Sequence, residues 1–159
     1  MHNQQTLVTA AAKLKEKHIK NTPQRQVILA YLMESKEHPS INMIYNHVLA
    51  NGFSVSLATI YNTLQLLVGN DLIIQVAADS DGHMRYDYYE RPHYHVICVR
   101  CNKIIDVFND DFRSVENDAY KRTGFKIYNS QCEVFGLCPE CQKKVAAEHD
   151  GNTSRGQVG

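Results

Sequence analysis

Apolar side chains recur every three or four residues through the first half of the chain, a spacing that predicts amphipathic helices. Four such stretches carry the apolar sets Leu7, Ala11 and Leu14; Val27, Ile28, Tyr31 and Leu32; Ile41, Ile44, Tyr45, Val48 and Leu49; and Leu57, Ile60, Leu64 and Leu67. Residues that favour helix N-caps precede three of them: Thr22, Ser40, and either Ser54 or Ser56. Pro23 suits a first helical position, and Gly52 and Gly69 are placed to end the third and fourth helices.

The hydrophobic period changes to two after Gly69, which indicates β-strands. Strands are expected at Leu72–Val76 and Met84–Tyr88, with a turn at residues 79–82 between them. Helices followed by a hairpin are the element order of a winged helix-turn-helix domain, predicted over residues 1–89. The helix that begins near Leu57 is then the recognition helix, and the hairpin is the wing.

The second half predicts a separate α/β unit over residues 90–146. Strands are expected at His93–Cys98, at Lys103–Phe108 and, as a long strand, from Phe125 to Phe135, with a helix near Asp110–Thr123. A small sheet with an open edge favours pairing with a second copy. The predicted fold class is therefore α+β, an N-terminal winged helix-turn-helix domain plus a small C-terminal α/β dimerisation domain. Residues 147–159 are polar and glycine-rich, so a disordered tail is expected there.

The charge balance gives no global signal for nucleic acid. The 159-residue chain carries 17 Lys and Arg against 17 Asp and Glu, so its formal net charge is zero. Any DNA-binding role must therefore depend on local geometry. The first residues lack the basic and apolar regions of a signal peptide, and no apolar run is long enough to span a bilayer. The expected location is the cytoplasm, where thiols stay reduced.

Two Cys-x-x-Cys pairs, Cys98/Cys101 and Cys138/Cys141, predict a structural zinc site of four thiolates in the C-terminal domain. Disulfides and scattered buried thiols are the alternatives, and a reducing compartment disfavours disulfides. The domain is too small for a generous core, so bound zinc would contribute folding energy. Cys132 is solitary and is interpreted as a small buried thiol.

Two histidines just before the first cysteine pair indicate a second metal site. Side chains of a strand alternate between its two faces, so His93 and His95 share one face while Cys98 lies on the other. The histidines therefore point away from the cysteine cluster. The strand predicts two metal sites side by side, one that holds the fold and one that could sense a signal.

Small and polar side chains lie on the outer face of the predicted recognition helix: Ser56, Ala58, Thr59, Tyr61 and Asn62. Such residues at a helix N-terminus can approach phosphates and base edges closely, and Asn62 could pair with adenine. The alternative is an ordinary polar helix face, because three-helix domains with hairpins also serve as protein-interaction modules.

Taken together, these motifs resemble the ferric uptake regulator family of metal-dependent repressors over about residues 14–144. The resemblance rests on Thr22-Pro23-Gln24-Arg25, His38-Pro39-Ser40, Ser56-Leu57-Ala58-Thr59-Ile60-Tyr61-Asn62, His93-x-His95-x-x-Cys98-x-x-Cys101 and Cys138-x-x-Cys141. It implies a homodimer that binds an inverted-repeat operator in double-stranded DNA, with Arg25 among the DNA contacts. It also implies Zn²⁺ on the four cysteines and a regulatory Fe²⁺ or Mn²⁺ at the hinge between the domains. The implied regulatory ligands are His38, Asp87, His93, His95 and Asp106.

Within this family the pattern is most similar to the peroxide-sensing branch, because Asp87 stands where iron sensors tend to have Glu. That branch implies a repressor of oxidative-stress and metal-homeostasis genes, and not an enzyme. It further implies that Fe(II) reacts with H₂O₂, that His38 or His93 is oxidised, and that the dimer then leaves DNA. A non-oxidative repressor that senses iron, manganese or zinc is the first alternative. A metalloenzyme with a His/carboxylate site and a protein-interaction adaptor are alternatives of other classes.

Overall fold

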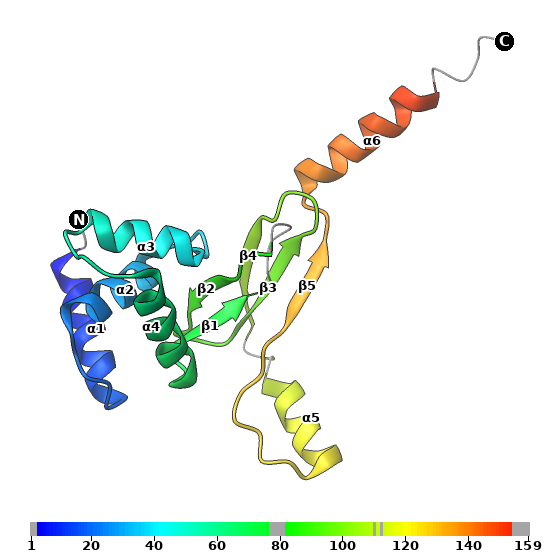
Figure 1. The fold of residues 1–159 in the computed structure, drawn as a ribbon. Coiled ribbons are helices and arrows are strands. Elements are labelled where there is room, and N and C mark those ends of the chain that lie inside the picture. The colour runs from blue at the N-terminus through cyan, green and yellow to red at the C-terminus, as the bar shows by residue number, and fades with distance from the viewer. Residues whose placement is uncertain (1–2, 77–81, 110, 112, 154–159) are drawn as a thin grey trace. The chain divides into compact units, whose positions relative to one another are not determined.

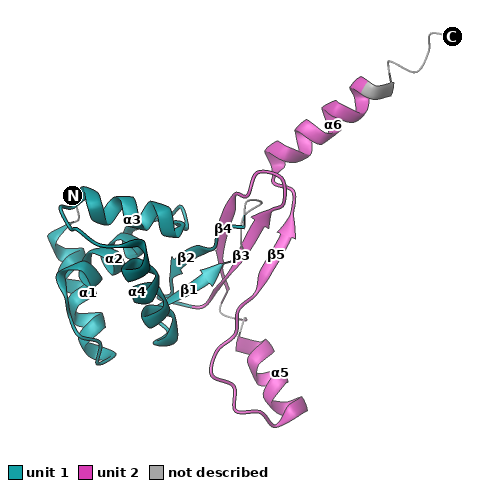
Figure 2. Ribbon diagram, viewed as in Figure 1, with its two compact units in different colours: residues 1–91 teal, residues 92–159 magenta. Residues whose placement is uncertain are grey.

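The chain forms two compact units, shown in different colours in Figure 2: unit 1 is residues 1–91 and unit 2 is residues 92–159. The computed structural model describes residues 3–76, 82–109, 111 and 113–153. The observed division falls two residues after the predicted boundary between residues 89 and 90. None of the helices in these described ranges is both long and apolar enough to cross a membrane.

Unit 1 begins with four helices, which are α1 (Gln4–Glu16), α2 (Pro23–Glu34), α3 (Ile41–Ala50) and α4 (Leu57–Gly69) (Figure 1). The predicted N-caps of the last three are confirmed, because the side chains of Thr22, Ser40 and Ser56 each accept a hydrogen bond from the backbone N–H three residues later. Gly52 has a φ of 84°, a left-handed conformation that lets the chain leave α3 sharply.

The core of unit 1 is built from the predicted stripes of α2, α3 and α4 together with Ala10 and Leu14 of α1. Leu49 and Leu57 were expected to be buried with the apolar stripes of α3 and α4. Both expectations were wrong, since Leu49 is 41% and Leu57 is 44% exposed. Leu57 is the first residue of α4, and helical side chains lean toward the N-terminus, so its side chain projects past the end of the packed stripe. Thr63 is buried in α4 in its place.

A two-stranded antiparallel hairpin completes unit 1. Strands β1 (Ile73–Val76) and β2 (Arg85–Tyr88) pair with Ile74 opposite Asp87. Most of the predicted turn between them, residues 79–81, lies outside the described residues. The order of helices followed by a hairpin confirms the winged helix-turn-helix prediction, with α3 and α4 as the helix pair and β1–β2 as the wing.

Unit 2 contains a three-stranded sheet with the order β4-β3-β5. Strand β3 (His93–Cys98) runs antiparallel to β4 (Ile104–Phe108) and parallel to β5 (Glu133–Gly136). Helix α5 (Arg113–Thr123) connects β4 to β5, and α6 (Pro139–Thr153) follows β5. In Figure 1, α5 and α6 extend from opposite ends of this sheet.

Two predictions about unit 2 are corrected. The last strand does not begin at Phe125, because β3 offers pairing partners only from His93 onward and the parallel register starts at His95 opposite Glu133. The expected disordered tail from residue 147 is helical as far as Thr153. Its Ala and Glu residues favour helix, and Glu148 forms an ion pair with Arg100 of the turn after β3. Residues 154–159 of that prediction lie outside the described residues.

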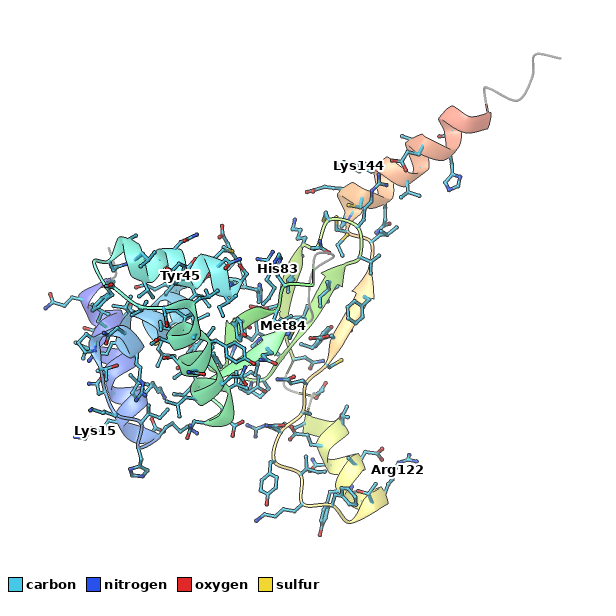
Figure 3. All side chains as sticks on the ribbon, in the orientation of Figure 1. Lys15, Tyr45, His83, Met84, Arg122 and Lys144 are labelled. Atoms are coloured by element: carbon cyan, nitrogen blue, oxygen red, sulfur yellow. The ribbon has the colours of Figure 1, made fainter. Side chains whose placement is uncertain are left out.

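The core of unit 2 is small. Helix α5 buries none of its side chains, and many large apolar side chains of the unit are exposed: Val99, Ile105, Phe108, Val115, Tyr120, Phe125, Tyr128, Val134, Phe135 and Leu137. Figure 3 shows Arg122 on α5 and Lys144 on α6 among the side chains of these two helices. Inside the unit, Ile97, Cys98 and Cys141 are buried. A unit with so little buried apolar surface needs an additional source of stability.

Candidate metal centres and DNA-binding surface

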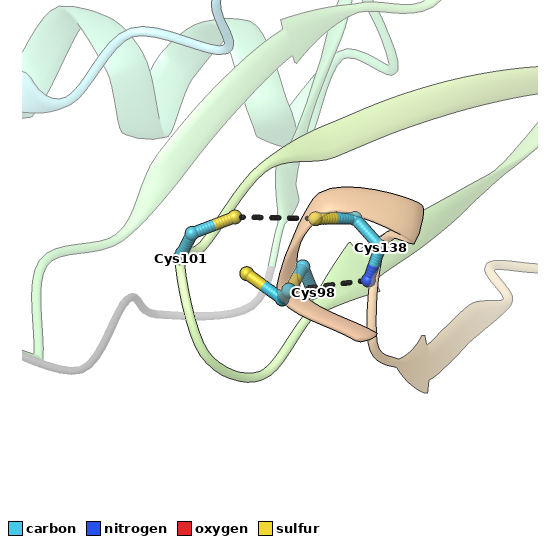
Figure 4. Close-up of side chains that lie close together, drawn as sticks. Cys98, Cys101 and Cys138 are labelled. Carbon is cyan, nitrogen blue, oxygen red and sulfur yellow. Dashed lines mark hydrogen bonds between the residues drawn. The ribbon is translucent and has the colours of Figure 1, made fainter. Parts of the chain in front are cut away.

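The four predicted zinc ligands converge at one end of the unit 2 sheet. The sulfur atoms of Cys98, Cys101, Cys138 and Cys141 all lie within 4.8 Å of one another. Cys101 Sγ and Cys138 Sγ are 3.8 Å apart, and Figure 4 shows these two side chains pointing toward each other. Two sulfurs on a tetrahedral zinc at about 2.3 Å would be about 3.8 Å apart, so the cluster has the right size for this ion. All five cysteines are free thiols, which removes the disulfide alternative.

Two turns of the backbone bring the cysteines together. After β3 the chain reverses through Asn102, whose φ is 60° and whose N–H donates to the carbonyl of Cys98 at 2.9 Å. This turn brings Cys101 back beside Cys98. The second pair brackets the start of α6, because Cys138 immediately precedes Pro139 and Cys141 lies in the first helical turn. A helix N-terminus favours negative charge, and therefore favours thiolates.

The electrostatics of the cluster fit a divalent cation. The pKa of Cys98 is lowered to about 6, chiefly because the backbone N–H of Cys138 donates to its sulfur, at 3.4 Å. Burial raises the pKa of Cys141 to about 12, and its hydrogen bonds to the neighbouring sulfurs act in the same direction. Four thiolates this close repel each other, so without a cation they cannot all ionise. Zn²⁺ supplies the compensating charge and accepts all four sulfurs.

Unit 1 holds two of the predicted regulatory ligands next to each other. His38 Nε2 lies 3.7 Å from Asp87 Oδ2, and both side chains are buried. His38 stands between α2 and α3, whereas Asp87 comes from the wing strand β2. The two residues are 49 positions apart in the sequence, and only the tertiary fold brings them together.

Unit 2 holds the other three predicted regulatory ligands. His93 Nε2 lies 3.2 Å from His95 Nε2, which in turn lies 3.3 Å from Asp106 Oδ1 of β4. The antiparallel register places Asp106 directly opposite His95, so their side chains share one face of the sheet. Two nitrogens about 2.1 Å from one ion and at right angles are about 3 Å apart, so the pair suits a shared metal. The expected parity of His93 and His95 is confirmed, since both are buried while Tyr94 between them is half-buried.

The predicted DNA-contacting residues lie on and near α4. Ser56 caps this helix, and its hydroxyl also lies 2.9 Å from that of Thr59. The other predicted contacts on this helix are all exposed: Ala58, Thr59, Tyr61 and Asn62. Arg25 lies apart from them in the first turn of α2, half-buried, with Nη1 donating to the carbonyl of Lys20 at 2.9 Å. The N-terminal half of α4 thus presents a polar face free of large charged side chains.

The sequence alone did not identify Arg85, which lies beside the two ligands of unit 1. Arg85 of β2 donates from Nη1 to the carbonyl of His38 at 3.4 Å. Its position two residues before Asp87, on the same side of the strand, is the signal that could have identified it.

The chain combines a winged helix-turn-helix unit with a second unit that carries a four-cysteine zinc-type cluster, and each unit holds a set of His and Asp ligands. These features define a metal-binding protein of the transcription-regulator class. The sequence profile of the ferric uptake regulator family matches residues 16–135, and the chain belongs to this family.

Two relatives are bacterial peroxide regulators. The chain is 37% identical over 138 residues to the peroxide operon regulator of Bacillus subtilis (strain 168), covering 87% of this chain and 94% of that protein. It is 36% identical over 139 residues to the peroxide-responsive repressor PerR of Staphylococcus aureus (strain Mu50), covering 87% and 93%.

Solved structures of the family share the fold. The peroxide stress regulator of Campylobacter jejuni matches with a TM-score of 0.67 and 29% identity, over 82% of this chain and 97% of that one. The ferric uptake regulator of Helicobacter pylori, described as having three functional metal-binding sites, matches with a TM-score of 0.66 and 25% identity, over 87% and 93%.

Proposed function

We propose that this protein is a metal-dependent, peroxide-responsive transcriptional repressor, cytoplasmic and not an enzyme, that controls oxidative-stress and metal-homeostasis genes. The observation that carries this proposal is the pair of His/Asp ligand sets, one in the DNA-binding unit and one beside the zinc cluster, in which every member except the half-buried Asp106 is buried. The peroxide regulators among its relatives support the same assignment. The non-oxidative alternative, a sensor of iron, manganese or zinc supply, is not better supported, because the two relatives reported above are both peroxide regulators.

The five ligands would form one regulatory site. His38 and Asp87 of unit 1 would join His93, His95 and Asp106 of unit 2 around a single ion. Three imidazoles and two carboxylates are a mixed nitrogen and oxygen set, which suits Fe(II) or Mn(II) and not the soft thiolate chemistry of the cysteine cluster. An ion held by both units favours one arrangement of the units over others, and so shifts the population toward a form that binds DNA.

A homodimer would give this arrangement its effect on DNA. The exposed apolar side chains of α5, β5 and the segment between them are the kind of surface that a second copy covers. Two recognition helices on a dimer must match two half-sites at a fixed spacing, which is why an inverted repeat is the expected operator. Small changes in the orientation of the DNA-binding units would then change affinity strongly.

Oxidation of a ligand would account for release. Held by the regulatory ligands, Fe(II) would supply the one-electron chemistry that activates H₂O₂ beside the imidazoles. His38 and His93 lie in the two ligand sets, and an imidazole that gains an oxygen atom binds metal less well. Zn²⁺ is not redox-active, so a zinc-loaded cysteine cluster would keep unit 2 folded while the regulatory site empties.

The peroxide assignment is tested by treating Fe(II)-loaded and Mn(II)-loaded protein with H₂O₂ and mapping peptide masses. We expect a single-oxygen addition on His38 or His93 in the Fe(II) form and none in the Mn(II) form. Operator binding should fall in parallel, and only in the Fe(II) form. Unmodified histidines together with unchanged DNA binding in the Fe(II) form would favour the non-oxidative sensor. Steady-state turnover of an added substrate would revive the metalloenzyme.

DNA recognition by α4 is tested with Asn62→Ala and Tyr61→Ala. Both side chains are exposed, so the fold should be unaffected, whereas loss of one base contact should weaken operator binding by about 1–3 kcal/mol, roughly 5- to 150-fold. Asn46→Ala, an exposed asparagine of α3, is the matched control and should bind as the wild type does. Fluorescence anisotropy with operator DNA over a range of salt concentrations measures this. Affinity that ignores salt would instead indicate a protein-interaction adaptor.

A further inference from the structure

The segment that carries His38 is held in an unusual backbone conformation. His38 has a φ of 51°, in the left-handed region that residues other than glycine rarely adopt. Such a conformation persists only where the surrounding structure imposes it. The contacts that impose it therefore also decide where the His38 imidazole lies.

Those contacts come from the wing strand β2. Arg85 Nη1 donates to the carbonyl of His38 at 3.4 Å, and the backbone N–H of Tyr86 donates to the carbonyl of Pro39 at 3.0 Å. The backbones of Ser40 and Arg85 also pair as an isolated antiparallel bridge. Arg85 Nη1 lies 3.5 Å from Met43 Sδ of α3 as well, so its guanidinium rests between two parts of the same chain segment.

Strand parity relates this arrangement to the metal ligand on β2. Side chains two residues apart on a strand point to the same side, so Arg85 and Asp87 face the His38 segment together. Arg85 contacts its backbone, and the Asp87 carboxylate lies 3.7 Å from its imidazole. One strand thus supplies a ligand and also a group that aims a second ligand at it.

We propose that Arg85 is a positioning residue that fixes His38 beside Asp87 before metal binds. This inference rests on the proposed regulatory site. Because His38 is already ordered, metal binding need not pay the conformational entropy of ordering that segment. Arg85 binds no metal itself, so its effect should resemble that of groups that orient ligands, whose loss typically weakens metal affinity about 10- to 100-fold.

The test compares Arg85→Met, Arg85→Lys, His38→Ala and Thr22→Ala in the full-length, zinc-loaded protein. Mn(II) affinity is measured from the electron paramagnetic resonance signal of the free ion. We expect no regulatory binding in His38→Ala, a loss of about 10- to 100-fold in Arg85→Met, and a smaller loss in Arg85→Lys, which keeps one donor. Thr22→Ala removes the N-cap of α2 in the same unit without touching His38, so it controls for general destabilisation and should retain wild-type affinity.

A second measurement does not depend on the metal. Hydrogen exchange of the Tyr86 amide, which donates to Pro39, should accelerate in metal-free Arg85→Met and stay unchanged in Thr22→Ala. Unchanged Mn(II) affinity or unchanged Tyr86 exchange in Arg85→Met would overturn the inference while leaving the regulatory site intact. Wild-type Mn(II) binding in His38→Ala would overturn the regulatory site, and with it the metal role of Arg85. If Arg85→Met does not fold, the graded loss expected of Arg85→Lys decides the matter.

Discussion

Replacing Cys141 by serine should release the zinc and unfold unit 2. The Cys141 side chain is one of the few buried side chains in this unit, and its sulfur completes the four-cysteine cluster. A hydroxyl is a much poorer zinc ligand than a thiolate, and the three remaining thiols cannot all ionise without the metal. Structural zinc binding in small domains has an apparent free energy of about 10–16 kcal/mol, comparable with or larger than the total stability of about 5–15 kcal/mol of an ordinary domain. Losing it should leave unit 2 without a stable fold.

Unit 1 should survive this substitution, because its helices and hairpin enclose a separate hydrophobic core. The expected product is therefore a monomer with a folded N-terminal half. Zinc content by mass spectrometry, molecular mass by analytical ultracentrifugation and amide spectra by NMR report the three consequences. Cys132→Ser is the matched control, because Cys132 is a half-buried thiol of the same unit outside the cluster and should leave zinc and dimer unchanged. A stable, zinc-free Cys141→Ser dimer would contradict the structural role of the metal.

Replacing His93 by alanine should have the opposite pattern, a folded zinc-bound dimer that no longer responds to metal. His93 Nε2 lies 3.2 Å from His95 Nε2, on the sheet face that carries Asp106 and not in the cysteine cluster. The zinc site is therefore untouched. The substitution also removes packing against the Phe108 ring, whose centroid is 5.2 Å from that of His93. This should cost little stability, because Phe108 is half-exposed.

The loss in metal affinity should exceed the roughly 10- to 100-fold typical of groups that only orient ligands, because His93 supplies a donor atom. A ligand shifts a two-state equilibrium according to the ratio of its affinities for the two states. Weaker metal binding to the DNA-binding form therefore removes most of the shift toward that form. Operator binding titrated with Mn(II) measures this, and zinc content and molecular mass show that the protein is intact. His149→Ala, an exposed histidine of α6, should behave as the wild type does. Metal-dependent operator binding that persisted in His93→Ala would remove this residue from the sensing site.

Local patterns in the chain predicted most of the secondary structure because each pattern depends on neighbouring residues. Thr22 and Ser40 could be recognised as caps, and the fourth cap narrowed to Ser54 or Ser56, because a cap bonds the backbone three residues away. The two errors in the extent of an element involve partners distant in sequence. The last strand is short because β3 offers nothing to pair with before His93, and α6 continues past residue 147, where Glu148 meets Arg100.

The sequence by itself determined the two cysteine pairs and the shared face of His93 and His95, because Cys-x-x-Cys spacing and strand parity are properties of a few adjacent residues. Family resemblance added His38, Asp87 and Asp106 by matching positions, without saying what holds them. Only the tertiary structure put the Asp87 carboxylate beside the His38 imidazole and the Arg85 guanidinium on the His38 carbonyl. The two contacts join His38 to residues that lie 47 and 49 positions further along the chain, and they depend on the left-handed backbone of His38. No local pattern specifies them, because their geometry exists only once β2 has packed against the segment before α3.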